Sequence, residues 1–214
     1  MHDLLNQNLQ YLEGRSQNLA DRLRGISPDP SLALITAESG DWTARKHSLD
    51  GSYQFLHSRI DPRQEARMWT ENQGIVMPRL VIIGIGLAYH VFELLKSCRN
   101  IKSAYLIEAD ESIFRLAMRV HDLSSLIQNT SIHFFIGSPL SDIENGLVTD
   151  LVQPFSFHIF SPIVSLYPDI YNPARELIEK HLCALRLKEQ GGETPDRLSF
   201  AEGVANLLKQ MSAA

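Results

Sequence analysis

The chain has 214 residues, of which 44% are hydrophobic and 21% charged; this composition is typical of a soluble globular protein and leaves room for one large domain. Its net charge of −5 disfavours a dedicated nucleic-acid binder, which usually carries an excess of basic residues. The longest apolar stretch, near residues 80–87, is far shorter than the roughly 20 residues of a membrane span, and no secretion signal opens the chain, so we expect neither membrane insertion nor secretion.

Residues 1–75 are predicted to form a small helix-plus-hairpin region. Leucines recur at near-helical spacing from Leu4 to Leu23, and Gly25 with the prolines that follow ends this helical segment. Two short strands, 32–37 and 42–47, are joined by the turn signal ESGD and indicate a hairpin. A third extended piece is expected at residues 53–57.

A helix is predicted over residues 62–71. Asp61 can cap it, Pro62 suits its first position, and Gln64 stands where a capping box places Glu or Gln. Arg63 and Arg67 share one face of this helix, which either meets an anionic group or is a solvated face paired with nearby glutamates.

Residues 76–214 are predicted to form a Rossmann-like domain with C-terminal helices. Buried strands at 80–83, 104–107, 131–136 and 155–160 alternate with helices at 89–98, 111–120 and 140–151. Repeated strand–helix units imply an α/β fold with a parallel sheet covered by helices on both faces. Helices are also expected at 172–190 and 199–211; the apolar stripe of the second indicates either core packing or a docking face.

The most informative motif is the glycine turn after the first buried strand. Gly84 and Gly86 allow a sharp turn and close approach of a ligand, and the N–H groups of the following helix suit a phosphate or carboxylate. Glu108 ends the next strand, where Rossmann-like folds hold ribose hydroxyls, and Asp110 follows it. His90 opens the helix after the turn. These five residues form a candidate pocket for a nucleotide or an S-adenosylmethionine-like ligand.

The turn departs from both known fingerprints. A dinucleotide motif requires glycine or alanine at position 89, where Tyr89 is expected to hinder close contact between helix and strand. The methyltransferase pattern requires an acid at 82 and glycine at 88, where this chain has Ile82 and Ala88. The alternative interpretation is therefore that the glycines only make the turn and that Glu108 caps the next helix.

No metal site is expected. Cys98 and Cys183 have no metal-ligand spacing, and the histidines form no His-x-His or His-x-x-x-His pair. His133 and His158 lie within predicted strands and are interpreted as residues of the core or of a sheet face. Two cysteines without a disulfide framework are typical of a protein in the reducing cytoplasm.

Four segments together resemble one known family. Residues 56–66 (LHSRIDPRQEA) look like the LHS(K/R)xDPxxEA signature of the motility accessory factor (Maf) proteins, and residues 84–90 (GIGLAYH) are similar to their GxGLGYH turn, with Ala88 in place of a glycine. Residues 105–114 (YLIEADESIF) resemble a strand end of the family that has proline where this chain has Ala109. Residues 165–171 (SLYPDIY) are similar to its LYPeFY segment.

This resemblance implies a role in the O-glycosylation of flagellin with nonulosonic acids from a CMP-sugar. In that family the matching segment is the N-terminal domain, and transfer is attributed to a central domain whose signature is missing here. The expected role is recognition of flagellin or support of a separate transferase, and no catalytic residue is carried over. The alternatives are a small-molecule-binding protein of the S-adenosylmethionine-dependent methyltransferase type and a vestigial product. Whether the chain is an enzyme, and its oligomeric state, stay open.

Overall fold

The structure is a computed structural model that describes residues 3–48, 51–98, 100–150 and 153–189. The helix predicted at 199–211 lies outside the described residues. Among the helices of the described part, none is both long and apolar enough to cross a membrane.

The chain begins with two helices where the leucine pattern predicted one helical segment. Helix α1 (Leu4–Glu13) ends at Gly14, and α2 (Gln17–Gly25) starts at Ser16, whose side chain accepts a hydrogen bond from the Leu19 N–H. The leucine spacing continues across this break because both helices bury their leucines against the same core. The N-cap at Ser16 thus divides into two helices a leucine pattern that, by its periodicity alone, indicated one.

The predicted hairpin is confirmed and extends to a third strand. Strands β1 (Leu32–Thr36), β2 (Trp42–His47) and β3 (Tyr53–Phe55) form an antiparallel sheet in the order β1-β2-β3. Helix α3 (Pro62–Glu71) follows with the predicted cap, since Asp61 accepts from the Gln64 N–H at 2.8 Å.

The predicted Rossmann-like α/β fold is confirmed by a second, parallel sheet. Its strands are β4 (Arg79–Ile83), β5 (Ser103–Glu108), β6 (Ile132–Ile136) and β7 (Ser156–Ile159), in the order β6-β5-β4-β7. The chain moves outward from β4 to β6 and then crosses back to place β7 on the other side. In such sheets, ligands bind beyond the carboxyl ends of the strands where the strand order reverses.

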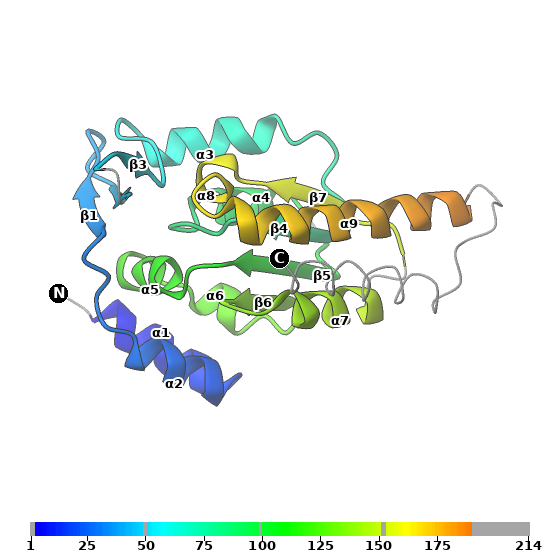
Figure 1. The fold of residues 1–214 in the computed structure, drawn as a ribbon, viewed down its shortest axis with the longest axis horizontal. Helices are drawn as coiled ribbons and strands as arrows, with labels where there is room; N and C mark the ends of the chain where they lie inside the picture. Colours follow the sequence, from blue (N-terminus) through cyan, green and yellow to red (C-terminus); the bar gives the residue numbers. More distant parts are fainter. Residues whose placement is uncertain (1–2, 49–50, 99, 151–152, 190–214) are drawn as a thin grey trace.

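Helices cover both faces of the parallel sheet (Figure 1). They are α4 (Tyr89–Ser97), α5 (Glu111–Val120), α6 (Ser124–Ile127), α7 (Leu140–Asp150), α8 (Ser161–Val164) and α9 (Pro168–Glu189). Side chains of β4 alternate between two apolar cores: Leu80 and Ile82 pack with α1, α2 and α4, whereas Val81 and Ile83 pack with α7 and α9. Both cores contain residues from before and after position 75, where the sequence predicted a boundary.

The two sheets meet at the carboxyl ends of the parallel strands. Figure 1 shows the strand arrows of the parallel sheet pointing toward the three-stranded sheet. Lys46 of β2 reaches Asp110 just after β5, and Gln54 of β3 donates to the Pro162 carbonyl in α8 at 2.6 Å. The hairpin region therefore covers the edge at which a Rossmann-like fold binds its ligand.

Candidate functional site at the carboxyl edge of the parallel sheet

The glycine turn is tightly enclosed. Gly84 and Gly86 have φ values of +84° and +55°, so both adopt backbone conformations that favour glycine. A Cβ atom at position 86 would lie 2.7 Å from Nε2 of His57, and one at position 84 would lie 3.0 Å from Cβ of Ile163. The space over the turn, which the sequence predicted for a ligand, is occupied by side chains of this chain.

Glu108 binds the glycine turn itself. Its buried carboxylate accepts hydrogen bonds from the Ile85 and Gly86 N–H groups at 2.9 and 3.0 Å. The other oxygen accepts from the Tyr171 hydroxyl at 2.6 Å and the Asp110 N–H at 3.2 Å. Burial raises the pKa of Glu108, and these hydrogen bonds oppose that rise. The acid predicted to hold ribose hydroxyls is thus satisfied within the protein.

His57 binds the next amide of the turn. Its Nε2 accepts from the Leu87 N–H at 3.0 Å, so the neutral ring carries its proton on Nδ1, which faces the Glu65 carboxylate at 3.2 Å. Burial lowers the pKa of His57, although Glu65 opposes this. The Gly84 and Ala88 amides bond to carbonyls. Every N–H from residue 84 to 88 therefore has an internal partner, and none of these five turn amides is left for a phosphate.

His90 is buried and contacts the glycine turn itself. Its ring stacks on Phe160 with centroids 3.8 Å apart, and Nε2 contacts the Gly84 carbonyl oxygen at 2.7 Å. The Nδ1 atom is buried and has no hydrogen-bond partner among the residues that the structure describes. Burial and the nearby His57 hold the pKa of His90 well below its usual value, so the ring is neutral.

Asp110 joins the two sheets. It accepts hydrogen bonds from Lys46 at 2.8 Å and from the Tyr167 hydroxyl, and its other oxygen accepts the Ser112 N–H at 2.8 Å to cap α5. Burial raises the pKa of Asp110, but Lys46 and Tyr167 outweigh burial and hold that pKa below its ordinary value. The alternative interpretation that Glu108 caps the helix is wrong, because Asp110 does so.

Tyr89 was expected to hinder close contact between helix and strand, but it takes part in the packing of α4. Its hydroxyl donates to the Trp42 carbonyl at 2.8 Å and accepts from the Trp42 N–H at 3.1 Å. The side chain is buried in the same core as Val81 and Ile83 of β4, and it fastens α4 to β2.

The structure brings all five predicted residues together but turns them inward. It also places at this junction four residues to which sequence reasoning gave no role: His57, Lys46, Tyr167 and Tyr171. Three of them stand in the motifs quoted above, which was the available signal. Lys46 had none. Among the described residues, no group of three or more His, Cys, Asp or Glu side chains is placed to hold a metal ion.

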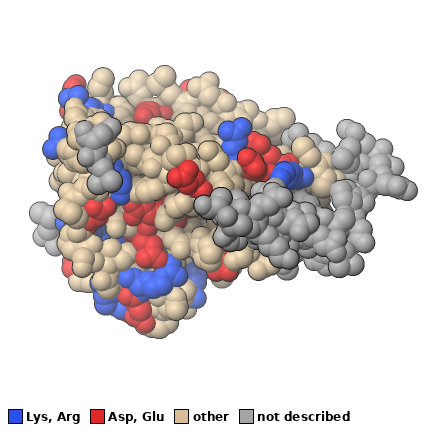
Figure 2. Space-filling view, viewed as in Figure 1, with Lys and Arg blue, Asp and Glu red and all other residues tan. Residues whose placement is uncertain are grey.

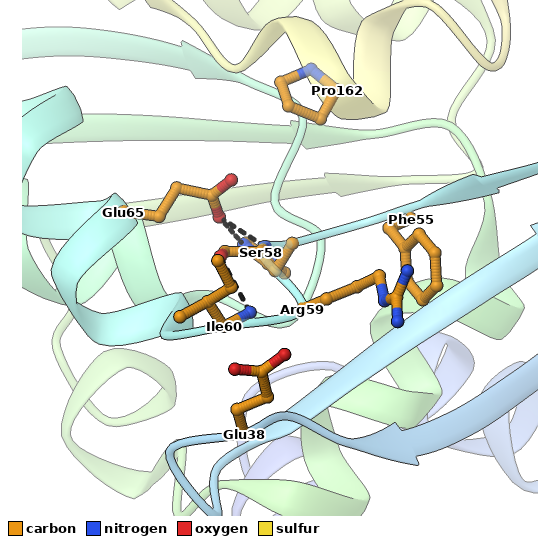
Figure 3. A pocket seen from close by; sticks show the side chains of 8 residues that line it. Glu38, Phe55, Ser58, Arg59, Ile60, Glu65 and Pro162 are labelled. Carbon is orange, nitrogen blue, oxygen red and sulfur yellow. Dashed lines mark hydrogen bonds and ion pairs between the residues drawn. The ribbon is translucent and has the colours of Figure 1, made fainter.

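An open hollow of about 460 Å³ lies beside this junction. It is lined by His57, Ser58, Arg59, Ile60 and Glu65 of the LHSRIDPRQEA segment, together with Glu38, Phe55 and Pro162. In Figure 3 the Arg59 side chain extends beside the Phe55 ring, and Glu65 is bonded to the Ser58 main chain. The LHSRIDPRQEA segment thus contributes His57 to the contacts with the glycine turn and also lines a hollow on the surface.

The fold and this junction define a Rossmann-like α/β domain whose ligand-binding edge is covered by its own N-terminal sheet. The family model of the glycosyltransferase Maf N-terminal domain matches residues 42–156, more than half of the chain. The chain belongs to this family, as the four motifs predicted.

One solved structure supports the fold. The MAf glycosyltransferase from Magnetospirillum magneticum AMB-1 is 15% identical, with a TM-score of 0.56, and the alignment covers 81% of this chain and 34% of that one. The chain thus spans about a third of that protein. Spermidine synthase from Thermotoga maritima matches with 13% identity over 57% of this chain and 52% of its own, at a TM-score of 0.30. The search of curated proteins gave no significant match.

Proposed function

We propose that the chain is a non-catalytic module of a Maf-type flagellin glycosylation system in the cytoplasm. In this role it recognises flagellin or supports the transferase, and the nonulosonic acid is transferred from its CMP-sugar by a different domain. The observation that carries the proposal is the closed carboxyl edge: the turn amides, Glu108 and His57 satisfy one another where related folds bind a ligand.

Membership of the family supports the same role. The neighbouring solved structure is a MAf glycosyltransferase, and this chain corresponds to about a third of it. A compact module with an internally satisfied junction suits a scaffold, since it needs no small molecule to complete its fold.

Thermal unfolding with candidate ligands tests the non-catalytic part of the proposal. We expect no shift in Tm with CMP, NAD or S-adenosylhomocysteine, because no amide of the turn is free to bind them. A ligand at 100 times its Kd would add about 2.7 kcal/mol to stability, so binding would be evident. A shift with S-adenosylhomocysteine would instead favour the methyltransferase-like alternative.

Deletion of the gene in its host tests the role in glycosylation. We expect the mass of flagellin to fall by its sugar residues, and tagged protein to co-purify with flagellin or with a transferase. A Tyr11→Phe variant, altered at an exposed site away from the junction, should restore the mass fully. Unchanged flagellin mass together with no association would overturn the proposal.

A further inference from the structure

The outer face of the three-stranded sheet presents two arginines that form no ion pair with any residue the structure describes. The Arg45 guanidinium lies over the Tyr53 ring at 5.6 Å, and its buried Nε has no hydrogen-bond partner within the described ranges. The Arg59 guanidinium lies over the Phe55 ring at 5.3 Å. A guanidinium placed over an aromatic ring can still donate its N–H groups to a carboxylate.

Both arginines border one hollow. A depression of about 310 Å³ is lined by Arg45, Arg59, Tyr53 and Phe55 among others, and it adjoins the 460 Å³ hollow, with which it shares Glu38, Phe55 and Arg59. Figure 3 shows Glu38 and Arg59 on this shared wall. The rims of both hollows are exposed, since Tyr53 of the smaller hollow is 52% and Ile60 of the larger is 63% accessible. A surface this open suits a long segment lying across it better than an enclosed metabolite.

Strand β3 offers a free edge beside this hollow. It is the last strand of its sheet. The bonds from Leu56 N–H to the Ala44 carbonyl and from Ser48 N–H to the Ser52 carbonyl show that residues 52, 54 and 56 face β2. The N–H and C=O groups of Tyr53 and Phe55 therefore point to the outer edge, where no other described residue bonds to them. Such an edge is a template for an incoming strand.

We propose that this face binds an extended, acidic segment of a partner protein. The segment would add to β3 as a further strand and place a carboxylate on Arg59, with Arg45 in the same hollow. Charge complementarity favours an acidic segment, because two guanidinium groups without an ion-pair partner among the described residues face the hollow and outweigh the single carboxylate of Glu38 on its rim. The inference deepens the proposed function and rests on it only for the identity of the partner.

Binding of synthetic peptides to the full chain tests this assignment. The probe is an acetylated, amidated octapeptide of alternating threonine and glutamate, measured by isothermal titration calorimetry against its threonine–glutamine counterpart. We expect the glutamate peptide to bind about tenfold or more tightly than the glutamine peptide, because charge-assisted bonds to Arg59 would be lost. Binding should weaken as salt is raised.

Three variants are expected to change the affinity for the glutamate peptide in different ways. Arg59→Gln should weaken binding of the glutamate peptide by about tenfold. Glu38→Gln should strengthen it severalfold, because a like charge leaves the hollow. Arg67→Gln removes the same charge from the exposed face of α3, outside the hollow, and should leave affinity unchanged. Circular dichroism confirms that each variant is folded.

Equal binding of the two peptides, or no effect of Arg59→Gln in a folded variant, would overturn the inference. So would undiminished binding of a peptide N-methylated at alternate residues, which cannot complete a strand, or equally effective competition by glutarate, which indicates a small-acid site. Each of these results leaves the scaffold proposal standing, because that proposal is decided by the glycosylation of flagellin.

Discussion

Ala88 holds a backbone conformation that L-residues rarely adopt. Its φ is +69°, the one positive value among the described residues other than glycine, and its methyl group is fully buried. The left-handed conformation costs about 1–2 kcal/mol for a residue with a Cβ. The position is tolerated because Ala88 bonds to the Ile85 carbonyl and precedes the first turn of α4.

We expect Ala88→Gly to leave the free energy of unfolding within about 1 kcal/mol of the original. Relief of backbone strain offsets the loss of one buried methyl group. The matched control is Ala117→Gly in α5, which is also fully buried but regularly helical. It should lose about 2 kcal/mol, since the methyl loss and the helix penalty of glycine add. Urea unfolding distinguishes them; equal losses would show that Ala88 is not strained.

The role of Glu108 predicts an effect on stability rather than on ligand binding. In Glu108→Gln, the amide nitrogen cannot accept the hydrogen bonds that one carboxylate oxygen now accepts. We expect a loss of about 1–3 kcal/mol in the free energy of unfolding. Glu71→Gln, at an exposed position on α3, should change it by less than about 0.5 kcal/mol. A fully stable Glu108→Gln variant would contradict the internal role.

The sequence could indicate which residues lie together at this edge of the sheet, but not which groups they form hydrogen bonds with. Gly84, Gly86 and Glu108 belong to one strand–turn–helix–strand unit, so their proximity follows from local topology. The partners that close the site come from distant parts of the sequence: His57 precedes Leu87 of the turn by 30 positions, and Tyr171 follows Glu108 by 63. A carboxylate looks the same in sequence whether it faces a ribose or a backbone amide.

At the scale of elements, the junction depends on contacts between the three-stranded sheet and the parallel one. Tyr89 ties α4 to the main chain of Trp42, and Lys46 of β2 binds both Asp110 and Asp29. Helices with strong local signals were predicted well: α3 and α5 begin after capping aspartates and match their expected bounds. Helix α9 begins at Pro168 rather than at residue 172, a start hidden by Pro173 inside it.

The element that closes the site was the one least visible in the sequence. Helix α8 has four residues, too few to show a helical period, and its residues were expected to follow a strand ending at Phe160. Yet its Ile163 lies over both glycines of the turn. Short elements therefore limited the prediction of the site more than that of the fold.

Replacing Tyr89 by Phe tests how strongly the sheets are joined. The variant keeps the ring but removes both hydrogen bonds to Trp42, and we expect a loss of about 1–2 kcal/mol in the free energy of unfolding. Tyr11→Phe, at an exposed position on α1, is the control and should be neutral. If the two variants unfold at the same urea concentration, the Trp42 contact does not contribute to the joint.

At the scale of the whole molecule, buried neutral histidines make stability depend on pH. His57, His90 and His158 are each at most 3% exposed, and burial lowers the pKa of all three, that of His158 to about 4. Below pH about 6.5 the unfolded chain takes up protons that the folded chain does not, so stability is retained above this pH and lost as the pH falls.

We expect the free energy of unfolding to fall steadily from pH 7 to pH 5, with about 1–2 kcal/mol of the loss due to His158 alone. The raised pKa values of Glu108 and Glu144 act in the opposite direction. His158→Gln keeps polar atoms near Ser156 and Gln73 and should flatten the curve. Urea titrations at several pH values measure it; a curve with no slope in this range would contradict the assignment.

The main-chain carbonyls at the two edges of the parallel sheet affect whether copies of the protein can associate by pairing their strands. Arg15 and Arg22 donate to the Ile132 and Ile136 carbonyls of β6. Figure 2 shows basic and acidic side chains intermixed at the end of the molecule where Figure 1 places α1 and α2. Trp69 donates to the Ile159 carbonyl of β7 at 3.3 Å. These bonds occupy carbonyls that an added strand would need, which disfavours strand addition at the borders of the parallel sheet and leaves the edge strands of the smaller sheet, β1 and β3, as the more open sites for it.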